Sequence, residues 1–259
     1  MEFYKITAAG NDFILLYNIF KTKSQIKNIA IKLCDRHYGI GADGLLILNK
    51  KGKEYFLDYL NSDGSFAFCG NGTRSAAWWI YKKFKKTKNF YINTSAGKLY
   101  VLIKKDDKIY LEMPKPDFIK DIDIDKNCSA KFVRVGTNHL VIEAENIDRL
   151  DVFNIGRNYR YDKRFSPQGT NVDFVEVLGL KNQKLIVKIR TYEKGVEEET
   201  YSCSSGIASS FYALIDKYNQ KEAIFISKMG QRFHLYFDKN SLYMFGPVKI
   251  VFRGWYELF

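Results

Sequence analysis

The sequence predicts an α+β fold of two homologous domains, each a curved, mostly antiparallel sheet or barrel wrapped on a central helix. Two observations support this prediction. One pattern of residues occurs twice along the chain, in the same order. In each half, short strand-like runs surround a segment with clear helical periodicity, and strands grouped around one long helix are typical of α+β domains.

The repeated pattern is built around Cys69 and Cys203. Cys69 opens the run Cys-Gly-Asn-Gly-Thr-Arg-Ser-Ala-Ala-Trp-Trp, and Cys203 opens the run Cys-Ser-Ser-Gly-Ile-Ala-Ser-Ser-Phe-Tyr. Each run leads to a turn-like segment with serine and glycine, and then to a strand-like run that ends in proline. Upstream, residues 10–15 resemble residues 137–142. Matches that keep the same order indicate two homologous halves.

The two copies predict where the domains begin and end. The N-terminal domain is expected over residues 1–114 and carries Cys69, and the C-terminal domain is expected over residues 115–247 and carries Cys203. A last strand-like segment within residues 248–259 follows the second copy, and we expect it to complete the first domain. The active site is expected in the cleft between the domains.

Local patterns predict the individual elements. Runs rich in β-branched and aromatic residues predict strands at Phe13–Tyr17, Leu45–Leu48, Phe90–Ile92, Leu99–Ile103, Lys131–Val135, Val172–Val177, Leu185–Thr191, Phe233–Phe237 and Lys249–Glu257. Helical apolar periodicity predicts helices at Gln25–Arg36, Thr73–Phe84 and Gly206–Tyr218.

Composition argues against several classes of protein. With 46% hydrophobic and 16% aromatic residues, the chain is too apolar for a disordered protein. It contains no apolar stretch long enough to span a membrane and no signal-peptide pattern, so we expect a cytoplasmic protein with no membrane partner. The net charge is +12, but the basic residues are spread along the chain, and we expect no nucleic-acid partner.

Cysteine and histidine usage argues against a metal site. The four cysteines form no Cys-x-x-Cys pair, and the chain has three histidines, which leaves little from which to build a zinc site. Structural disulfides are not expected in a chain without an export signal. Cys34 lies in an apolar helical run, so we interpret it as a core residue.

The two repeated cysteines suggest proton-transfer chemistry. Each stands directly before a helix, where free N–H groups and a partial positive charge are expected to lower the pKa of a thiol. The same N–H groups can hold a substrate carboxylate. Two such sites would place a base on each side of an α-carbon, so that one thiolate removes the proton and the other thiol returns one to the opposite face. The alternative is that both cysteines only pack in the core, but their repetition at equivalent positions favours the chemical interpretation.

These residues resemble the diaminopimelate epimerases, a family that acts without pyridoxal phosphate. The most specific block is Asn-Ser-Asp-Gly-Ser at residues 61–65, which runs into Cys-Gly-Asn-Gly-Thr-Arg at residues 69–74. Further blocks of the same family pattern lie at residues 10–13, 36–44, 171–175, 192–195 and 199–203. The resemblance covers nearly the whole chain and implies an amino-acid substrate and no cofactor.

The resemblance also implies roles for individual residues. Cys69 and Cys203 are implied to be the acid/base thiols. The implied substrate-binding residues are Asn11, Asn61, Gly70, Asn71, Asn171, Glu193, Lys194, Ser204 and Ser205. His139 and Glu193 are implied to tune the pKa of the thiols. The alternatives are an ordinary turn or cap role for each asparagine, a core role for His139 and a solvated surface charge for Glu193.

Several positions depart from the family pattern. Lys194 stands where the family usually has arginine, which removes the planar fork that binds a carboxylate through two hydrogen bonds. Ser204 stands where glycine is common. The run Gly-Thr-Asn-His at residues 136–139 replaces Gly-Asn-Pro-His. The reaction type survives these changes, whereas Lys194 and Thr137 bear on the distal end of the substrate.

Three hypotheses for function follow. The first is interconversion of LL- and meso-diaminopimelate, for lysine and peptidoglycan synthesis. The second is a related racemase for histidine, lysine or another amino acid. The third is a non-catalytic binding protein, against which the presence of both thiols argues. The expected partner is a small amino-acid substrate, and the expected assembly is a homodimer, although no residue pattern fixes it.

Overall fold

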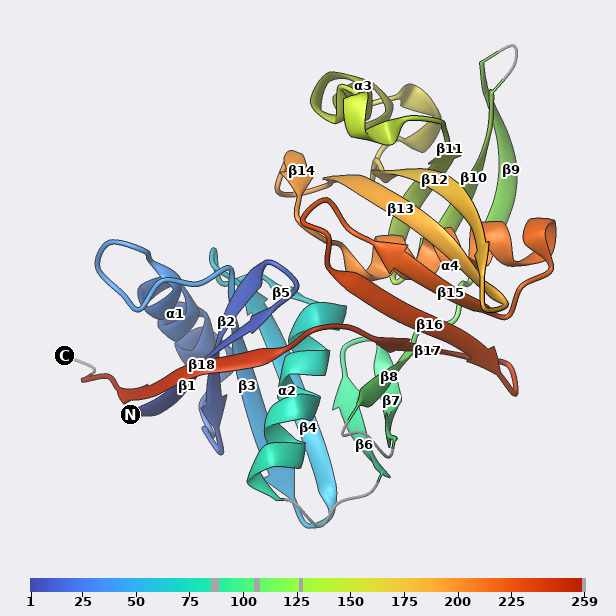
Figure 1. The fold of residues 1–259 in the computed structure, drawn as a ribbon. Helices are drawn as coiled ribbons and strands as arrows, with labels where there is room; N and C mark the ends of the chain where they lie inside the picture. The colour runs from blue at the N-terminus through green and yellow to red at the C-terminus, as the bar shows by residue number, and fades with distance from the viewer. Residues whose placement is uncertain (85–88, 105–107, 126–127, 258–259) are drawn as a thin grey trace. The chain divides into compact units, whose positions relative to one another are not determined.

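The computed structural model describes residues 1–84, 89–104, 108–125 and 128–257 (Figure 1). The chain divides into two compact units. Unit 1 comprises Met1–Glu112 together with Gly246–Phe259, and unit 2 comprises Met113–Phe245. Both units combine strands with helices, which confirms the predicted α+β class. The last two residues of the expected final segment, 258 and 259, lie outside the described residues.

Unit 1 contains β1 (Glu2–Ala8), β2 (Asn11–Tyr17), α1 (Lys23–Cys34), β3 (Gly44–Lys51), β4 (Glu54–Asn61), β5 (Phe66–Ala67), α2 (Gly70–Lys83), β6 (Asn89–Thr94), β7 (Gly97–Ile103), β8 (Ile109–Met113) and β18 (Lys249–Trp255). Unit 2 contains β9 (Phe118–Asp125), β10 (Cys128–Val135), β11 (Thr137–Glu143), α3 (Val152–Arg160), β12 (Asn171–Lys181), β13 (Lys184–Glu193), β14 (Glu198–Thr200), α4 (Ser204–Tyr218), β15 (Glu222–Ile226), β16 (Arg232–Asp238) and β17 (Ser241–Phe245). Short 3₁₀ turns at Ile147–Arg149 and Lys163–Phe165 flank α3.

Strand pairing follows the same scheme in both units. In unit 1, β1 and β2 are antiparallel, β2 and β3 parallel, β3 and β4 antiparallel, and β4 and β6 parallel. In unit 2, β10 and β11 are antiparallel, β11 and β12 parallel, β12 and β13 antiparallel, and β13 and β15 parallel. Antiparallel hairpins complete each sheet.

One strand of each sheet comes from outside the repeated scheme. In unit 1, β18 pairs antiparallel with β1, from Glu2 opposite Trp255 to Thr7 opposite Lys249. In unit 2, β9 pairs antiparallel with β10. Each sheet is therefore completed by a strand that follows the other unit's last hairpin in the sequence.

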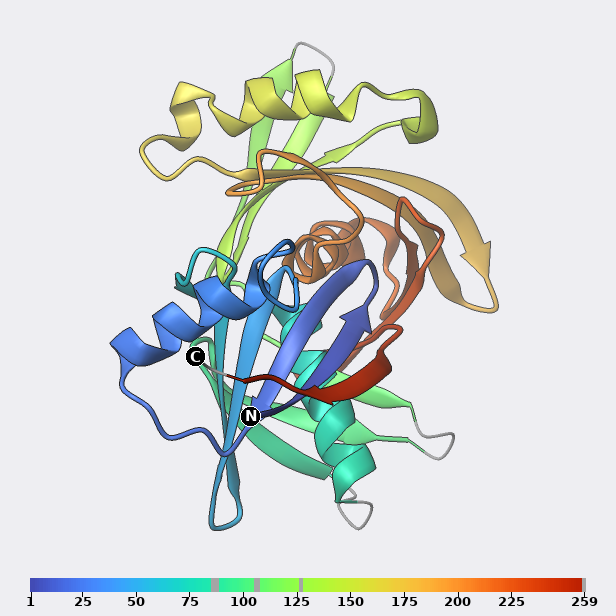
Figure 2. The ribbon, with the colours of Figure 1, turned by 90° about the vertical axis from the view of Figure 1, so that its left-hand side faces the viewer.

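A buried helix occupies the middle of each unit. Helix α2 packs on β1 to β4, and α4 packs on β10 to β13. Figure 2 looks along α4 and shows the strands of unit 2 curving around it. Small residues in the first turn of each helix allow this close approach to the sheet. No helix in the described part of the chain is long and apolar enough to cross a membrane.

Candidate active site

Cys69 caps the N-terminus of α2. Its backbone is extended, with φ −134° and ψ 112°, and the Gly72 N–H donates to its Sγ over 3.3 Å. Gly72 packs closely against its neighbours: a Cβ there would lie 2.9 Å from Leu46 Cδ2, which would have to shift, and 3.6 Å from the cysteine sulfur. The sulfur therefore faces the first N–H groups of the helix, where the helix dipole favours negative charge.

A buried cation lies one turn further along α2. Arg74 is 1% exposed, and its Nη2 donates to Asn71 Oδ1 over 2.5 Å. Burial lowers the pKa of Arg74 to about 10, and the neighbouring Cys69 sulfur acts in the opposite direction. The guanidinium therefore keeps its charge at neutral pH and attracts negative charge on Cys69.

A line of hydrogen bonds connects this helix start with β2. Asn71 Nδ2 donates to Asn11 Oδ1 over 2.7 Å, and Asn11 Nδ2 donates to Asp43 Oδ2 over 3.0 Å. The orientation of both amides is thereby fixed, because Arg74 requires the oxygen of Asn71 and Asp43 requires the nitrogen of Asn11. The structure thus brings together Asn11 and Asn71, two of the sequence-predicted substrate-binding residues.

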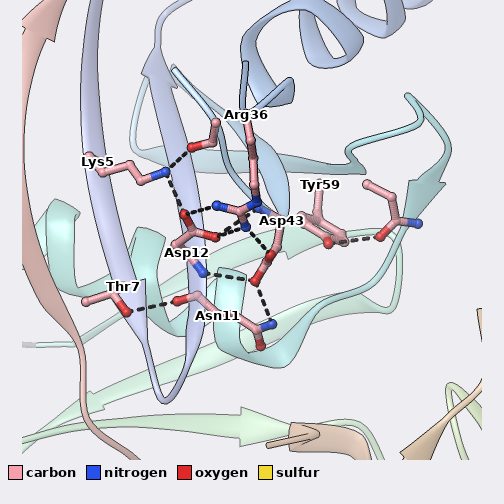
Figure 3. Close-up of polar contacts among 9 residues, drawn as sticks. Lys5, Thr7, Asn11, Asp12, Arg36, Asp43 and Tyr59 are labelled. Atoms are coloured by element: carbon pink, nitrogen blue, oxygen red, sulfur yellow. Dashed lines mark hydrogen bonds and ion pairs between the residues drawn. The ribbon is translucent and has the colours of Figure 1, made fainter. Parts of the chain in front are cut away.

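Asp43 is held in turn by an ionic cluster at the start of β2 (Figure 3). Arg36 Nη2 lies 2.8 Å from Asp12 Oδ1 and 2.6 Å from Asp43 Oδ1, and Lys5 Nζ lies 2.7 Å from Asp12 Oδ2. Burial opposes ionisation of Asp12, but the hydrogen bonds and charges of Arg36 and Lys5 outweigh it and lower the pKa of Asp12 to about 2. The cluster therefore fixes Asp43, which in turn fixes the amide of Asn11.

We expect this cluster to make the free energy of unfolding depend on pH in the acid range. The pKa of Asp12 lies below its ordinary 3.8, so its carboxylate stabilises the fold above about pH 4, and this contribution is lost as the pH falls toward about 2. Arg36→Ala is expected to cost about 1 kcal/mol of unfolding free energy at pH 7 and about half of that at pH 3. Urea unfolding at both pH values measures the effect.

The control for this measurement is Lys98→Ala, which breaks an exposed ion pair with Glu54. Exposed pairs contribute little, so this variant should match the wild type at both pH values. An equal cost of Arg36→Ala at pH 7 and pH 3 would contradict the assignment to Asp12.

Asn61 closes a turn of its own. The Tyr59 hydroxyl donates to Asn61 Oδ1 over 2.9 Å, and Asn61 Nδ2 donates to Ser65 Oγ over 2.9 Å. Asp63 Oδ1 accepts from both the N–H and the hydroxyl of Ser65. These are the local hydrogen bonds of a turn asparagine, and contact between Asn61 and substrate stays a prediction.

Cys203 caps the N-terminus of α4 in unit 2. Its φ of −118° and ψ of 113° are close to those of Cys69. The residue is 8% exposed, and its Sγ lies 3.3 Å from Ser205 Oγ. Ser204, the first residue of the helix, is 4% exposed. Each unit therefore places one thiol at the same point of its buried helix.

The Cys203 thiol has a raised pKa, which corrects the prediction that a helix start lowers it. Burial raises the pKa of Cys203 most, and the carboxylates of Glu193 and Asp173 raise it further, whereas the Ser205 hydroxyl lowers it in part. Loss of hydration outweighs the partial charge of the helix start. The prediction was wrong for Cys203, whose resting form is the neutral thiol.

His139 lies in a hydrogen-bonded chain beside Cys203, in which His139 and Asp173 are fully buried. Its Nε2 lies 3.0 Å from Ser205 Oγ, and its Nδ1 lies 2.7 Å from Asp173 Oδ2. Thr191 Oγ1 donates to the other oxygen of Asp173 over 2.7 Å. The structure thus brings the predicted residues His139 and Ser205 together with Cys203, at hydrogen-bond distances.

Glu193 is held on the same side of the unit. Thr200 Oγ1 donates to its Oε2 over 2.8 Å, and its charge acts on Cys203. Glu193 is half-buried. It is therefore not the solvated surface charge that was the alternative to a role beside the thiols. Its contact with substrate stays a prediction.

Asn171 and Lys194 lie at neighbouring strand ends. Asn171 Nδ2 donates to Asn138 O, and Asn171 Oδ1 accepts from the Lys194 N–H, both over 2.8 Å. Asn138 Nδ2 donates to Gly169 O over 3.0 Å, and Lys194 Nζ lies 3.3 Å from Gln168 O. The side-chain amides of Asn171 and Asn138 thus hold these strand ends together. The substrate contacts predicted for Asn171 and Lys194 stay predictions.

Sequence reasoning missed Arg74 and Asp173. Arg74 is 1% and Asp173 0% exposed, although arginine and aspartate are almost never fully buried unless they are paired. The available signal was a charged residue inside a run that otherwise predicts a buried helix or strand. Arg74 lies within the block at residues 69–74, and Asp173 lies within the block at residues 171–175.

Comparisons with known proteins give the family. The family model described as diaminopimelate epimerase matches residues 3–119. The diaminopimelate epimerase of a Hydrogenobaculum species is 33% identical over 98% of this chain and 99% of its own length. That of Thermotoga maritima is 35% identical over 94% of this chain and 97% of its own length.

Solved structures with low sequence identity share the fold. A phenazine biosynthesis protein of the PhzF family from Enterococcus faecalis has a TM-score of 0.75 at 17% identity, with 99% of both chains covered. A probable proline racemase from Agrobacterium radiobacter has a TM-score of 0.72 at 12% identity, with 99% of this chain and 93% of the other covered. The full-length identity to the curated relatives, together with the paired cysteine helix starts, shows that the chain belongs to the diaminopimelate epimerase family.

Proposed function

We propose that this protein interconverts LL- and meso-diaminopimelate by two-base proton transfer, without a cofactor. The observation that carries the proposal is the placement of Cys69 and Cys203 as N-caps of equivalent buried helices. The curated relatives are named diaminopimelate epimerases, which favours this substrate over histidine or lysine. A cytoplasmic location is part of the proposal.

The proposed reaction is a balanced exchange of two protons at one α-carbon. A thiolate on one face takes the α-proton, so that the C–H bond breaks and an S–H bond forms. The thiol on the other face then gives its proton to the planar carbanion, so that its S–H bond breaks and a new C–H bond forms. The enzyme ends with the protonation states of the two thiols exchanged, and proton exchange resets them.

The carbanion needs stabilisation, because an α-proton is a weak acid. Free N–H groups of the first turn of α2 and of α4 are suited to bind the substrate carboxylate and to take up its developing charge. We assign this role to the turns that contain Gly70 and Asn71 in unit 1 and Ser204 and Ser205 in unit 2. Asn11 is suited to bind the substrate amino or carboxylate group, because Asp43 and Asn71 hold its amide in one orientation.

The test is α-proton exchange in deuterated water. The protein is incubated with EDTA, without added cofactor, and with LL-diaminopimelate, meso-diaminopimelate, histidine or lysine in separate samples. Exchange and stereochemical inversion of diaminopimelate alone are expected. Turnover of histidine or lysine with no turnover of diaminopimelate would overturn the substrate assignment, and loss of all turnover in EDTA would overturn the cofactor-free mechanism.

We expect mutation of Lys194 to change the substrate preference. Lys194→Arg replaces a point charge with a planar group that can bind the distal carboxylate through two hydrogen bonds. We expect kcat/KM for diaminopimelate to be retained or to rise by up to about fivefold, which corresponds to about 1 kcal/mol. Steady-state kinetics of the two proteins gives the comparison. A loss of more than tenfold would show that the pocket is built around lysine.

A further inference from the structure

We propose that a cavity between α1 and the sheet of unit 1 binds a zwitterionic amino carboxylate, with the ligand carboxylate at Lys21 and Lys51 and the ligand ammonium group at Asp58. The inference goes beyond the proposed function and does not rest on it, because it concerns a second binding site and a binding event without turnover.

The cavity has a volume of about 700 Å³ and lies within unit 1. Its walls are residues 19–22, which precede α1, the first turn of α1, and residues 93–95 at the end of β6. Its floor is formed by β3 and β4. Pockets of this size are typical of small-molecule sites, so the cavity can hold a ligand of the size of an amino acid.

The sheet separates this cavity from the helix start at Cys69. Leu46 of β3 faces α2, since a Cβ on Gly72 would lie 2.9 Å from its Cδ2. Successive residues of a strand point to opposite faces, so Ile47 lies on the other face, where it belongs to the core cluster that α1 covers. Figure 1 shows α1 and α2 on either side of β2 and β3. The cavity under α1 is therefore distinct from the site at Cys69.

The register of β3 and β4 sets the order of the polar residues on the cavity floor. Asn49 pairs with Phe56. The pair two residues further into the sheet carries Asp58, and the pair two residues toward the β3–β4 turn carries Lys51. Residues two apart on a strand share one face, and they are about 7 Å apart along it. The floor therefore has a cation at one end, a carboxylate at the other and an aromatic ring between them.

The positive end of the cavity consists of Lys21 and Lys51. Both line the cavity, and neither forms an ion pair within the described part of the chain. Lys51 Nζ lies 5.6 Å from the centroid of the Phe56 ring, so its head group lies over the floor. Two ammonium groups without a carboxylate partner attract an anionic group, and a ligand carboxylate can accept a charge-assisted hydrogen bond from each.

The negative end of the cavity is Asp58, which forms no hydrogen bond or ion pair with another described residue. Burial raises the pKa of Asp58, and the charge of Lys23 lowers it in part. Although Asp58 is partly exposed, its carboxylate thus loses hydration without gaining a partner, and a ligand ammonium group would stabilise its charged form. Asn49 Oδ1, in the same floor, is buried and has no hydrogen-bond partner among the described residues. The three N–H groups of an ammonium can serve both oxygens.

The two ends together select a ligand that carries both charges. An anion alone would be repelled by Asp58, and a cation alone would be repelled by the two lysines. The Phe56 ring separates the ends, and Phe20, which also lines the cavity, is 63% exposed. Apolar surface of this kind favours a hydrocarbon chain. The ligand class is therefore an amino carboxylate whose ammonium and carboxylate are joined by an apolar chain.

The test is an NMR titration of the full chain with 6-aminohexanoate, which carries both charges on an apolar chain. Hexanoate and hexylamine carry one charge each, and glycine carries both charges without the chain. We expect saturable shifts of the backbone amides in the first turn of α1 and in β3 and β4, with 6-aminohexanoate bound at least tenfold more tightly than each of the other three.

Several results of this titration would overturn the proposal. Equal affinity for hexanoate would indicate an anion site, and equal affinity for hexylamine would indicate a cation site. Equal affinity for glycine would show that the apolar surface takes no part. Absence of saturable binding, or shifts confined to the residues around Cys69 or Cys203, would show that the cavity is not a site for this class of ligand.

Two matched pairs of variants locate the charged groups. Asp58→Asn and Glu54→Gln each remove one carboxylate from β4, and Lys51→Met and Lys53→Met each remove one ammonium group from the β3–β4 hairpin. Glu54 and Lys53 do not line the cavity. We expect Asp58→Asn and Lys51→Met to weaken binding of 6-aminohexanoate at least tenfold, and the two controls to stay within twofold of the wild type.

Hexanoate distinguishes a direct contact from a change of net charge. Asp58→Asn should leave its affinity unchanged or raise it, because the variant removes a repulsive charge, whereas Lys51→Met should lower it. Equal weakening of 6-aminohexanoate binding in a variant and in its control would overturn the proposal. Failure of the proposed epimerase function would leave all of these affinities as expected, so the two failures are distinguishable.

Discussion

Replacement of Cys69 or Cys203 by alanine is expected to abolish epimerisation, with a loss of kcat on the order of 10³-fold or more, the scale of general acid–base catalysis. Each variant lacks the proton donor or acceptor on one face of the α-carbon. The remaining thiol can still exchange a proton on its own face. We therefore expect deuterium incorporation from one stereoisomer only, with opposite preferences in the two variants. NMR of LL- and meso-diaminopimelate in separate samples measures this.

Cys34→Ala is the control for the two active-site variants. Cys34 is 2% exposed in the core of unit 1, and burial raises its pKa to about 12. It has no part in the proposed chemistry, so this variant should keep wild-type epimerisation. Near-wild-type epimerisation by Cys69→Ala or Cys203→Ala would contradict the two-thiol mechanism and leave the repeat as a record of duplication alone.

Gly206→Ala is expected to combine a large loss of activity with a loss of stability. A Cβ at this position would lie 2.3 Å from Asp173 Oδ1, and that carboxylate cannot yield easily because His139 and Thr191 hold both of its oxygens. Overpacking of this kind typically costs about 1–3 kcal/mol. Asp173 also holds His139, which is implied to tune the thiols, so displacement of Asp173 should lower kcat by at least tenfold. Urea unfolding and steady-state kinetics on the same preparation give both quantities.

Ser209→Ala is the matched control on the same helix. Ser209 is 0% exposed, and its hydroxyl has no hydrogen-bond partner among the described residues. Removal of an unsatisfied buried hydroxyl should leave the unfolding free energy within about 1 kcal/mol of the wild type or raise it. If Gly206→Ala proved as stable and as active as Ser209→Ala, the first turn of α4 would not be constrained by Asp173.

The elements that carry the thiols could be predicted because their signals are local. The start of α2 follows from Cys69, the small residues after it and the helical periodicity of the next turns, and the same pattern marks α4. Helix α3 was not predicted. It is short, begins at Val152 and contains Gly156, a poor helix former. The glycine is needed because a Cβ there would lie 2.5 Å from Tyr192 Cβ, which is a tertiary requirement.

The buried partners of the site could not be predicted because they depend on strand register. His139 and Asp173 are far apart in sequence, and they meet because β11 and β12 run parallel with His139 opposite Asn171 and Val141 opposite Asp173. Residues two apart on a strand share one face, so the register places His139 and Asp173 on the same side of the sheet. A shift by one residue would separate them. No local pattern in the sequence fixes that register.

The sign of the Cys203 pKa shift shows a similar limit. The helix start is visible in the sequence and predicts a more acidic thiol. Burial and the facing carboxylates reverse this effect, and they come from strands distant in the chain. Environment therefore decides whether a helix-capping cysteine rests as thiol or thiolate.

The strand β18 determines the order in which the two units can be completed as the protein is synthesised. Unit 2 is one continuous stretch, Met113–Phe245, whereas unit 1 requires β18, from Lys249 to Trp255, beside β1. The ribosome therefore releases every strand of unit 2 before the sheet of unit 1 can close. Until then the β1 edge carries unpaired backbone groups, and such an open edge can pair with a strand of another chain.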